Sequence, residues 1–482
     1  MSVSPQPLPL IAPNPPRLSE LGDDLRRVEA SGVFSNHGPE ARAFEAEVTQ
    51  VMFGGHGASL AVANATLGLM IAIRDAAGMS PRPGTLAIMP ALTFAATAQA
   101  AYWAGLTPLV IDVDPLDWSA AAAAEERLLR QYGRRIGVVL PYATFGNVID
   151  LDRYARMAER HGVGVVIDAA SSLGTIDAAG DGFGARAPFA TVYSMHATKT
   201  FAVAEGGLIH SGDPARIARL RAMTNFGFEG SRSATLPGLN AKLPEVLAVM
   251  ARAKLAGIDA VCDARAELEA AYRDVLGAEQ AGFGLQAAAG RRRAMQFMPV
   301  LLPPHLAVRR EEIVAAMAAA GVGTGRYFSP HLGEQPWVRS VSMVEATPVA
   351  DRVAGALLSL PITDAMTPAD ARRAAVALID ACSVTSSARP YRDRRPRQLP
   401  AIASTLIVGG GPAGTALLTA ATKRGLLSRF AEGLVMVERD VGVGNGRLGR
   451  YAITSDSTAQ TFLTAVKDNF HPELAALVDH PA

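Results

Sequence analysis

The 482-residue sequence has only two cysteines, Cys262 and Cys382, and carries almost no net charge, +1 at pH 7. Two cysteines cannot build a disulfide framework, and they fit a reducing compartment. The 46 basic and 45 acidic residues balance each other, so nothing in the charge favours a polyanionic partner such as nucleic acid. The composition therefore excludes a disulfide-stapled scaffold and gives no indication of a nucleic-acid-binding protein.

The sequence also lacks a long uninterrupted apolar run. The most apolar long stretch, 91–106, contains two threonines and a glutamine and lies between two prolines. It is predicted to be a buried helix, too short to cross a membrane. Six prolines lie between positions 5 and 16, with no basic segment leading into an apolar run, so no signal peptide is expected. These features predict a cytoplasmic protein without a membrane partner.

Short apolar runs and helical stretches alternate between residues 58 and 210. The predicted strands are 59–63, 85–88, 109–113, 136–140 and 164–167. The predicted helices are 66–77, 95–103, 121–131 and 151–160. This alternation is typical of an α/β fold in which helices cover a mostly parallel sheet.

Four segments are expected along the chain. Residues 1–260 are predicted to hold an amino-terminal arm and a large domain, and 261–385 a smaller α/β domain joined to it by the helical stretch 243–276. Residues 386–403 are rich in arginine and proline without apolar periodicity, which indicates a solvated linker rather than a nucleic-acid tail. Residues 404–482 are predicted to begin another domain.

Asp168 directly follows the apolar run 163–167. It should therefore lie at the carboxyl end of a buried strand, where open α/β sheets place ligand-binding groups. An aspartate there can keep a ring nitrogen protonated, which pyridoxal phosphate (PLP) needs in order to act as an electron sink. Taken alone, Asp168 is better explained as a helix cap.

Lys199 lies between a predicted strand and the sequence EGG at 205–207, in a stretch without other charged side chains from 188 to 204. A lysine in a partly desolvated pocket has a lowered pKa and can form an imine with an aldehyde. Ser194 and Thr198 nearby supply hydroxyl groups suited to a phosphate. Together with Asp168, this pattern favours a PLP site over a solvated surface lysine.

The order of these motifs resembles the DegT/DnrJ/StrS family of PLP-dependent sugar aminotransferases over roughly residues 18–385. The motifs that carry the resemblance are GVFSNHGP at 32–39, NATLGL at 64–69, PALTF at 90–94, Asp168, YSMHATKT at 193–200, GLNAK at 238–242, RYFSPH at 326–331 and LLSLP at 357–361. The resemblance implies the type I fold of PLP-dependent transferases, with a large domain and a smaller α/β domain.

By the same resemblance, Lys199 is the catalytic lysine that binds PLP covalently, and Asp168 pairs with its pyridine nitrogen. Ser194 contacts the phosphate, and Phe94 stacks on the ring. Ser171 stands three residues after the aspartate, where the family often has a glutamine that contacts the ring hydroxyl.

The remaining site residues are also implied by the resemblance. Thr66 and Leu67 belong to the phosphate-binding turn, where a helix amino terminus offers free N–H groups. Asn240 is expected to reach the phosphate site of a neighbouring subunit, which implies a homodimer with shared active sites. Tyr327 and His331 are expected on the substrate side, although His331 is equally well explained as a core histidine.

The carboxy-terminal segment contains the pattern GxGxxG through Gly409, Gly411 and Gly414. The pattern follows a predicted strand, 404–408, and opens a predicted helix, 415–424. Glu438 ends the next predicted strand. This context is typical of a Rossmann-like βαβ unit and resembles the start of an FAD-dependent oxidoreductase.

Only 44 residues follow Glu438, so we expect a partial unit that would bind FAD only if the rest of such a domain were present.

The sequence thus predicts a PLP-dependent aminotransferase without a metal site. The expected amino donor is glutamate, and the expected acceptor is a nucleotide-linked ketosugar. One alternative is a module of a bifunctional natural-product enzyme that acts on a non-sugar ketone and carries a fused FAD-dependent oxidoreductase. Two further alternatives from other classes are a flavin oxidoreductase and a non-catalytic protein with the PLP fold.

Overall fold

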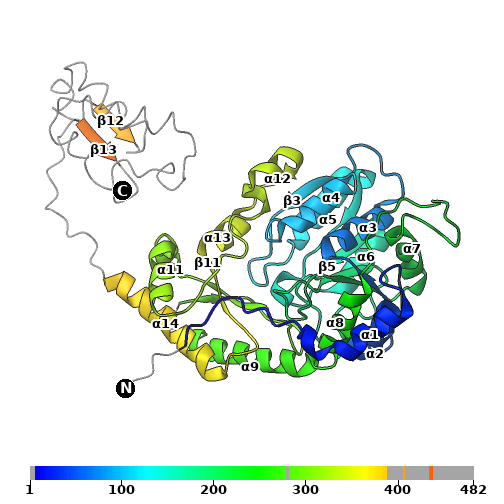
Figure 1. Ribbon diagram of the computed structural model, residues 1–482. Helices are drawn as coiled ribbons and strands as arrows, with labels where there is room; N and C mark the ends of the chain where they lie inside the picture. The colour runs from blue at the N-terminus through cyan, green and yellow to red at the C-terminus, as the bar shows by residue number, and fades with distance from the viewer. Residues whose placement is uncertain (1–5, 278–281, 388–404, 409–433, 438–482) are drawn as a thin grey trace, which may run out of the picture. The chain divides into compact units, whose positions relative to one another are not determined.

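The computed structural model describes residues 6–277, 282–387, 405–408 and 434–437. Contacts divide the chain into two units, Met1–Ala388 and Arg389–Ala482. The first unit contains a large part built on an eight-stranded sheet and a smaller part built on a three-stranded sheet (Figure 1). Among the described residues, no helix is long and apolar enough to span a bilayer.

The strands of the large sheet lie in the order β1-β7-β6-β5-β4-β2-β3-β10. Their bounds are β1 (Ala58–Val62), β2 (Leu86–Pro90), β3 (Thr107–Ile111), β4 (Ile136–Val139), β5 (Gly164–Asp168), β6 (Ala190–Ser194), β7 (Gly207–Ser211) and β10 (Met343–Val344). Only β7 runs against its neighbours, β1 and β6. The mostly parallel sheet predicted from the alternation of apolar runs is therefore present.

Helices cover both faces of this sheet, so its strands are buried on both sides. The helices are α1 (Gly22–Ser31), α2 (Pro39–Phe53), α3 (Ala65–Ala77), α4 (Ala95–Trp103), α5 (Ala122–Tyr132), α6 (Leu151–His161), α7 (Pro214–Thr224) and α8 (Glu245–Leu255). Along β5, Val165 and Ile167 pack in one core with α2, α5, α6 and α8. Val166 faces the other core, with α3, α4 and α7. Each face of β5 thus contributes to a separate apolar layer.

The smaller part packs its helices on an antiparallel sheet in the order β11-β9-β8. Its elements are α9 (Ile258–Leu276), β8 (Gly284–Leu285), β9 (Phe297–Leu301), α10 (Pro304–Ala307), α11 (Arg310–Ala319), α12 (Pro336–Val341), α13 (Pro348–Ala356), β11 (Leu357–Pro361) and α14 (Pro368–Ser387). A third core joins α9, α11 and α14 to β9 and β11. Figure 1 shows α9 running from beside α8 toward α14, so this helix connects the two parts.

Most predicted elements are found within two residues of their expected ends. The helical stretch predicted at 243–276 is two helices, α8 and α9, because Ala256 and Gly257 separate them. The boundary predicted near residue 260 lies at the start of α9, and the one at 385 lies inside α14. The first two positions of the predicted linker are the end of α14, and the rest of it lies outside the described residues. The four segment boundaries stay predictions.

In the second unit the structure describes two strands, β12 (Thr405–Val408) and β13 (Leu434–Val437). They pair in parallel, with Thr405 opposite Leu434 and Val408 opposite Val437. Both strands lie within the ranges expected from the sequence, 404–408 and 434–438, and each is one residue shorter. The predicted helix at 415–424 lies outside the described residues.

Candidate active site

One edge of the large sheet gathers most of the predicted site residues. Strands β2, β4, β5 and β6 run in the same direction. Strand β1 also runs in this direction, because β7 is antiparallel both to β1 and to β6. Their carboxyl ends therefore lie at one edge, where open α/β sheets bind ligands. Asp168 and Ser194 end β5 and β6, while Thr66, Phe94 and Tyr142 follow β1, β2 and β4.

A cavity of about 640 Å³ opens at this edge, a size within the usual range for small-molecule sites. Eight of the predicted site residues line it: Thr66, Leu67, Phe94, Asp168, Ser171, Ser194, Lys199 and Tyr327. The same cavity is also lined by Asn64, Tyr142, His196, Thr198, Glu205, Gln296, Phe297 and Phe328. Residues separated by up to 264 positions in the chain, from Asn64 to Phe328, thus share one space.

Lys199 presents its amine to this cavity. Its Nζ donates hydrogen bonds to Ser171 Oγ at 3.1 Å and to Gln296 Oε1 at 3.1 Å. Burial lowers the pKa of Lys199 to about 8, against the opposing attraction of the Asp168 carboxylate. A lysine with such a pKa has a substantial unprotonated fraction near neutral pH, which is the form that attacks an aldehyde.

Asp168 is almost fully buried at the end of β5, with 2% of its surface exposed. Its Oδ2 accepts a hydrogen bond from Thr97 Oγ1 at 2.6 Å, and its Oδ1 accepts one from the Ala170 amide at 3.1 Å. Burial raises the pKa of Asp168, while these two donors and Lys199 act in the opposite direction. No helix begins between β5 and β6, a segment that is described throughout, so Asp168 is not a helix cap.

The amino terminus of α3 forms another wall of the cavity. Asn64 caps this helix by accepting a hydrogen bond from the Leu67 amide at 2.9 Å. A helix amino terminus carries a partial positive charge and attracts anions such as phosphate. The hydroxyl-bearing residues Thr66, Ser194 and Thr198 line the same cavity.

Aromatic rings form much of the remaining wall. Phe94 is 56% exposed, and its ring centroid lies 6.1 Å from that of Phe328. Tyr327 stacks on Phe297, with centroids 5.0 Å apart and an angle of 14° between the planes. Phe94 thus lies exposed on the cavity wall, and its stacking on a cofactor ring stays a prediction.

Two predicted site residues lie outside the cavity. His331 is buried, with Nε2 2.8 Å from Asp351 Oδ1 and Nδ1 accepting from the Gly333 amide at 3.1 Å. Both ring nitrogens are thus occupied, as in a core histidine. Asn240 is exposed, and its backbone pairs with that of Asn225.

Several residues that line the cavity were not predicted from the sequence, above all Gln296 and Tyr142. Gln296 lies 97 positions after Lys199 and directly precedes β9, so no local pattern connects the two. Tyr142 lies three residues after β4 and pairs with Asp168 in an isolated parallel bridge, and its place after an apolar strand could have identified it. Burial raises the pKa of Tyr142, whose hydroxyl is bonded to Ser171.

Gly409, Gly411, Gly414 and Glu438 lie outside the described residues. In the part of the chain that is described, no group of three or more His, Cys, Asp or Glu residues is arranged to hold a metal ion.

Comparison with known proteins gives a consistent result. The model of the DegT/DnrJ/EryC1/StrS aminotransferase family matches residues 18–378. Among curated proteins, UDP-N-acetyl-3-dehydro-alpha-D-glucosamine 3-aminotransferase of Acidithiobacillus ferrooxidans is 28% identical over 337 residues, which are 69% of this chain and 85% of that protein. Protein Rv3402c of Mycobacterium tuberculosis is 29% identical over 378 residues, 78% of this chain and 90% of that protein.

Solved structures agree over a similar length. A putative PLP-dependent aminotransferase from Bacillus cereus is 32% identical, with a TM-score of 0.72 and coverage of 77% of this chain and 100% of that one. The structure of DesI with its TDP-sugar product is 31% identical, with a TM-score of 0.69 and coverage of 79% and 95%.

Proposed function

Because the chain belongs to the DegT/DnrJ/EryC1/StrS aminotransferase family and is a PLP-dependent aminotransferase, we propose that its acceptor is the keto group of a nucleotide-linked sugar. Glutamate is the proposed amino donor. The observation that carries the site assignment is Lys199, whose amine points into the cavity that Asp168 also lines. The acceptor assignment is supported by the relatives, which include an aminotransferase named for a UDP-linked dehydro sugar and a structure that holds a TDP-sugar product.

The residues around the cavity fit PLP in each of its chemical parts. Lys199 supplies an amine for the aldehyde, and the buried carboxylate of Asp168 suits a protonated ring nitrogen. The amino terminus of α3, with Thr66 and Leu67, together with Ser194 suits the phosphate. When bound, PLP supplies an electron sink that stabilises negative charge at the carbon that carries the amino group.

The proposed role of Lys199 is to bind the cofactor and, once free, to move a proton. Its Nζ takes a proton from the carbon that carries the amino group of the donor. In the second half of the reaction it gives a proton to the former keto carbon of the acceptor. A pKa of about 8 suits both steps, because a group works best as acid and base when its pKa lies near the working pH. Ser171 accepts a hydrogen bond from the same Nζ at 3.1 Å, and we propose that it orients the free amine.

The proposed role of Asp168 is to keep the ring nitrogen protonated. Burial makes an unpaired charge at this position costly. The ionised carboxylate is therefore stabilised most when a cation lies beside it. Thr97 and the Ala170 amide fix its orientation by bonding one oxygen each.

The substrate side is proposed to include Tyr327, which lines the cavity beside Phe328. His331 lies four residues later and bonds to Asp351 on α13. We propose that His331 anchors the loop that carries Tyr327, rather than touching substrate itself.

A non-sugar ketone remains the alternative acceptor, and one observation favours it. Four aromatic side chains, Phe94, Phe297, Tyr327 and Phe328, line the cavity, and such a wall also suits an apolar or aromatic ketone. This is the acceptor expected of a natural-product enzyme.

We further propose that the active unit is a homodimer. Asn240 is exposed and stands on a loop outside its own cavity, so it is free to reach a neighbouring subunit's phosphate site. A two-fold axis would then place two such loops symmetrically.

For residues 404–482 we retain the proposal of a partial dinucleotide-binding segment without a complete FAD site. It is supported by the parallel pairing of β12 with β13, which a βαβ unit requires. We propose a cytoplasmic location, supported by two cysteines that are buried and unbonded.

The direct test of the acceptor is an assay with glutamate and a panel of ketones read by mass spectrometry. The panel includes nucleotide-linked 3-keto and 4-keto sugars and aromatic ketones, and Lys199→Ala serves as the inactive control. We expect an aminated nucleotide sugar and one equivalent of 2-oxoglutarate. Amination of the aromatic ketones alone would contradict the sugar proposal and favour the alternative.

A further inference from the structure

Gln296 lies just before β9 and lines the cavity, with 8% of its surface exposed. Its Oε1 accepts hydrogen bonds from Lys199 Nζ at 3.1 Å and from Ser171 Oγ at 3.4 Å. Both partners donate, so the oxygen of the amide must face them and the nitrogen must face away.

The amide nitrogen of Gln296 has no hydrogen-bond partner among the described residues. An amide nitrogen carries two N–H donors, and Nε2 is not one of the buried atoms that lack a partner, so these donors face the open cavity. Because Gln296 lines the cavity, an acceptor on a ligand there can take a hydrogen bond from Nε2.

The backbone around Gln296 is held firmly in place. Thr200, the residue after Lys199, donates its hydroxyl to the carbonyl oxygens of Ala294 at 3.2 Å and Met295 at 3.1 Å. Arg265 of α9 donates to the same Met295 oxygen at 2.9 Å. The segments that carry Lys199 and Gln296 are therefore bonded to each other immediately beside the two side chains.

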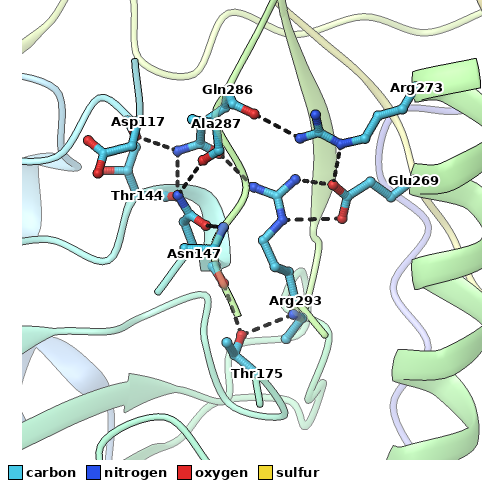
Figure 2. A network of polar contacts seen from close by, with 12 residues as sticks. Asp117, Thr144, Asn147, Thr175, Glu269, Arg273, Gln286, Ala287 and Arg293 are labelled. Atoms are coloured by element: carbon cyan, nitrogen blue, oxygen red, sulfur yellow. Dashed lines mark hydrogen bonds and ion pairs between the residues drawn. The ribbon is translucent and has the colours of Figure 1, made fainter. Parts of the chain in front are cut away.

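A second set of contacts holds the segment that precedes Gln296 (Figure 2). Arg293 forms a buried ion pair with Glu269 of α9 and also donates to Gln286 Oε1 at 3.0 Å. Gln286 in turn donates to the carbonyl oxygens of Asp117 at 2.8 Å and Thr144 at 3.0 Å. These contacts bind the segment to both the large and the small part of the unit. The backbone that carries the Gln296 side chain is therefore held in place.

The chemistry of PLP identifies the acceptor. Its phenolic oxygen is attached to the ring carbon next to the one that bears the aldehyde, so it lies beside the atom that Lys199 bonds. A residue that contacts Lys199 Nζ is therefore close to this oxygen as well. We propose that Gln296 is a cofactor-binding residue whose Nε2 donates a hydrogen bond to the phenolic oxygen of PLP, while Oε1 orients Lys199. This inference rests on the proposed role of Lys199 as the residue that binds PLP.

The test compares PLP with 3-deoxypyridoxal 5'-phosphate, an analogue that lacks only the phenolic oxygen. The dissociation constants of both are measured by absorbance for the wild-type protein, Gln296→Leu and Gln286→Leu. We expect Gln296→Leu to weaken PLP binding about tenfold more than binding of the analogue, the usual effect of losing a hydrogen bond to a charged oxygen.

Gln286→Leu is the matched control, because it removes an amide from the same segment outside the cavity. It should weaken both ligands equally. Gln296→Glu keeps the shape and replaces the N–H donors by a charged oxygen. Its charge favours the protonated form of Lys199 and so weakens both ligands, but it also repels the phenolic oxygen, so PLP binding should fall by more than binding of the analogue.

Equal weakening of PLP and the analogue in both Gln296 variants would overturn the contact with the phenolic oxygen. A wild-type protein that binds neither ligand at Lys199 would instead overturn the proposed function on which the inference rests. The two failures are therefore distinguishable without measuring turnover.

Discussion

At the scale of single residues, Lys199 and Asp168 influence each other's protonation. Burial lowers the pKa of the Lys199 amine to about 8, and the Asp168 carboxylate opposes this shift. In protein stripped of cofactor, labelling of Lys199 by an amine-reactive reagent should therefore rise with a midpoint near pH 8. Peptide mass spectrometry at a series of pH values measures it.

The variant Asp168→Asn tests whether the Asp168 carboxylate raises the pKa of Lys199. It removes a negative charge that favours the protonated amine, so the midpoint for Lys199 should move to lower pH. Lys254, which pairs with Asp364, serves as the internal control and should keep its midpoint. A Lys199 midpoint at the ordinary lysine value of about 10.4, or an upward shift in the variant, would contradict this account.

Single residues also show where sequence reasoning succeeds and where it stops. Asp168 could be predicted because it directly follows an apolar run, and strand ends in a parallel sheet share one edge. Gln296 could not be predicted, since its approach to Lys199 depends on the packing of β9 and on long-range bonds such as that of Thr200 to Ala294. Ser171 was recognised as a departure from the family pattern, and the glutamine that bonds to it comes from elsewhere in the chain.

At the scale of elements, α9 holds the segment before β9 through Glu269. Burial acts to raise the pKa of Glu269, but the Arg293 and Arg273 guanidinium groups lower it overall. Because the folded pKa is depressed, this pair contributes stability at neutral pH that is lost as the pH falls through the folded pKa. The pair is mostly buried, so its removal should be costly.

We expect Glu269→Gln to lower the free energy of unfolding by about 3–5 kcal/mol, because it leaves the buried Arg293 without its counter-charge. The matched control is Asp259→Asn on the same helix, whose carboxylate pairs with Arg292 while 64% exposed. It should cost less than about 1 kcal/mol. Urea denaturation of both variants measures the difference, and equal costs would show that the Glu269 pair does not hold the segment.

Elements were predicted well where apolar periodicity was strong. The strands around Ile88 and Val166 were expected because short apolar runs recur between helical stretches. The break between α8 and α9 was not expected, since Ala256 is a good helix former and the single Gly257 is a weak signal. On either side of the break, α8 contacts α2 and α9 contacts α14, so the two helices have different packing partners.

At the scale of the whole molecule, the position of Asn240 predicts an assembly. If the loop that carries it completes a neighbouring subunit's phosphate site, the active protein is at least a dimer. Light scattering of the holoenzyme should give twice the chain mass of 50.4 kDa or a multiple of it. A monomer with full aminotransferase activity would contradict the shared site.

The tail beyond the linker is expected to contribute nothing to transamination. A single strand–helix–strand unit has too little core to offset the entropy of ordering it. Ending the chain after Arg397 should therefore leave the rate with glutamate unchanged, and the full chain should bind no FAD in a fluorescence titration. Loss of activity on truncation, or tight FAD binding by the full chain, would show that this interpretation of the tail is wrong.

The central claim is that Lys199 carries PLP, and one measurement addresses it directly. The holoenzyme is reduced with borohydride, digested and analysed by peptide mass spectrometry. The account predicts a pyridoxyl group on Lys199, one per chain, with Lys242 and Lys254 unmodified. A pyridoxyl group on another lysine, or reduction that leaves Lys199 unlabelled in protein that contains PLP, would contradict it.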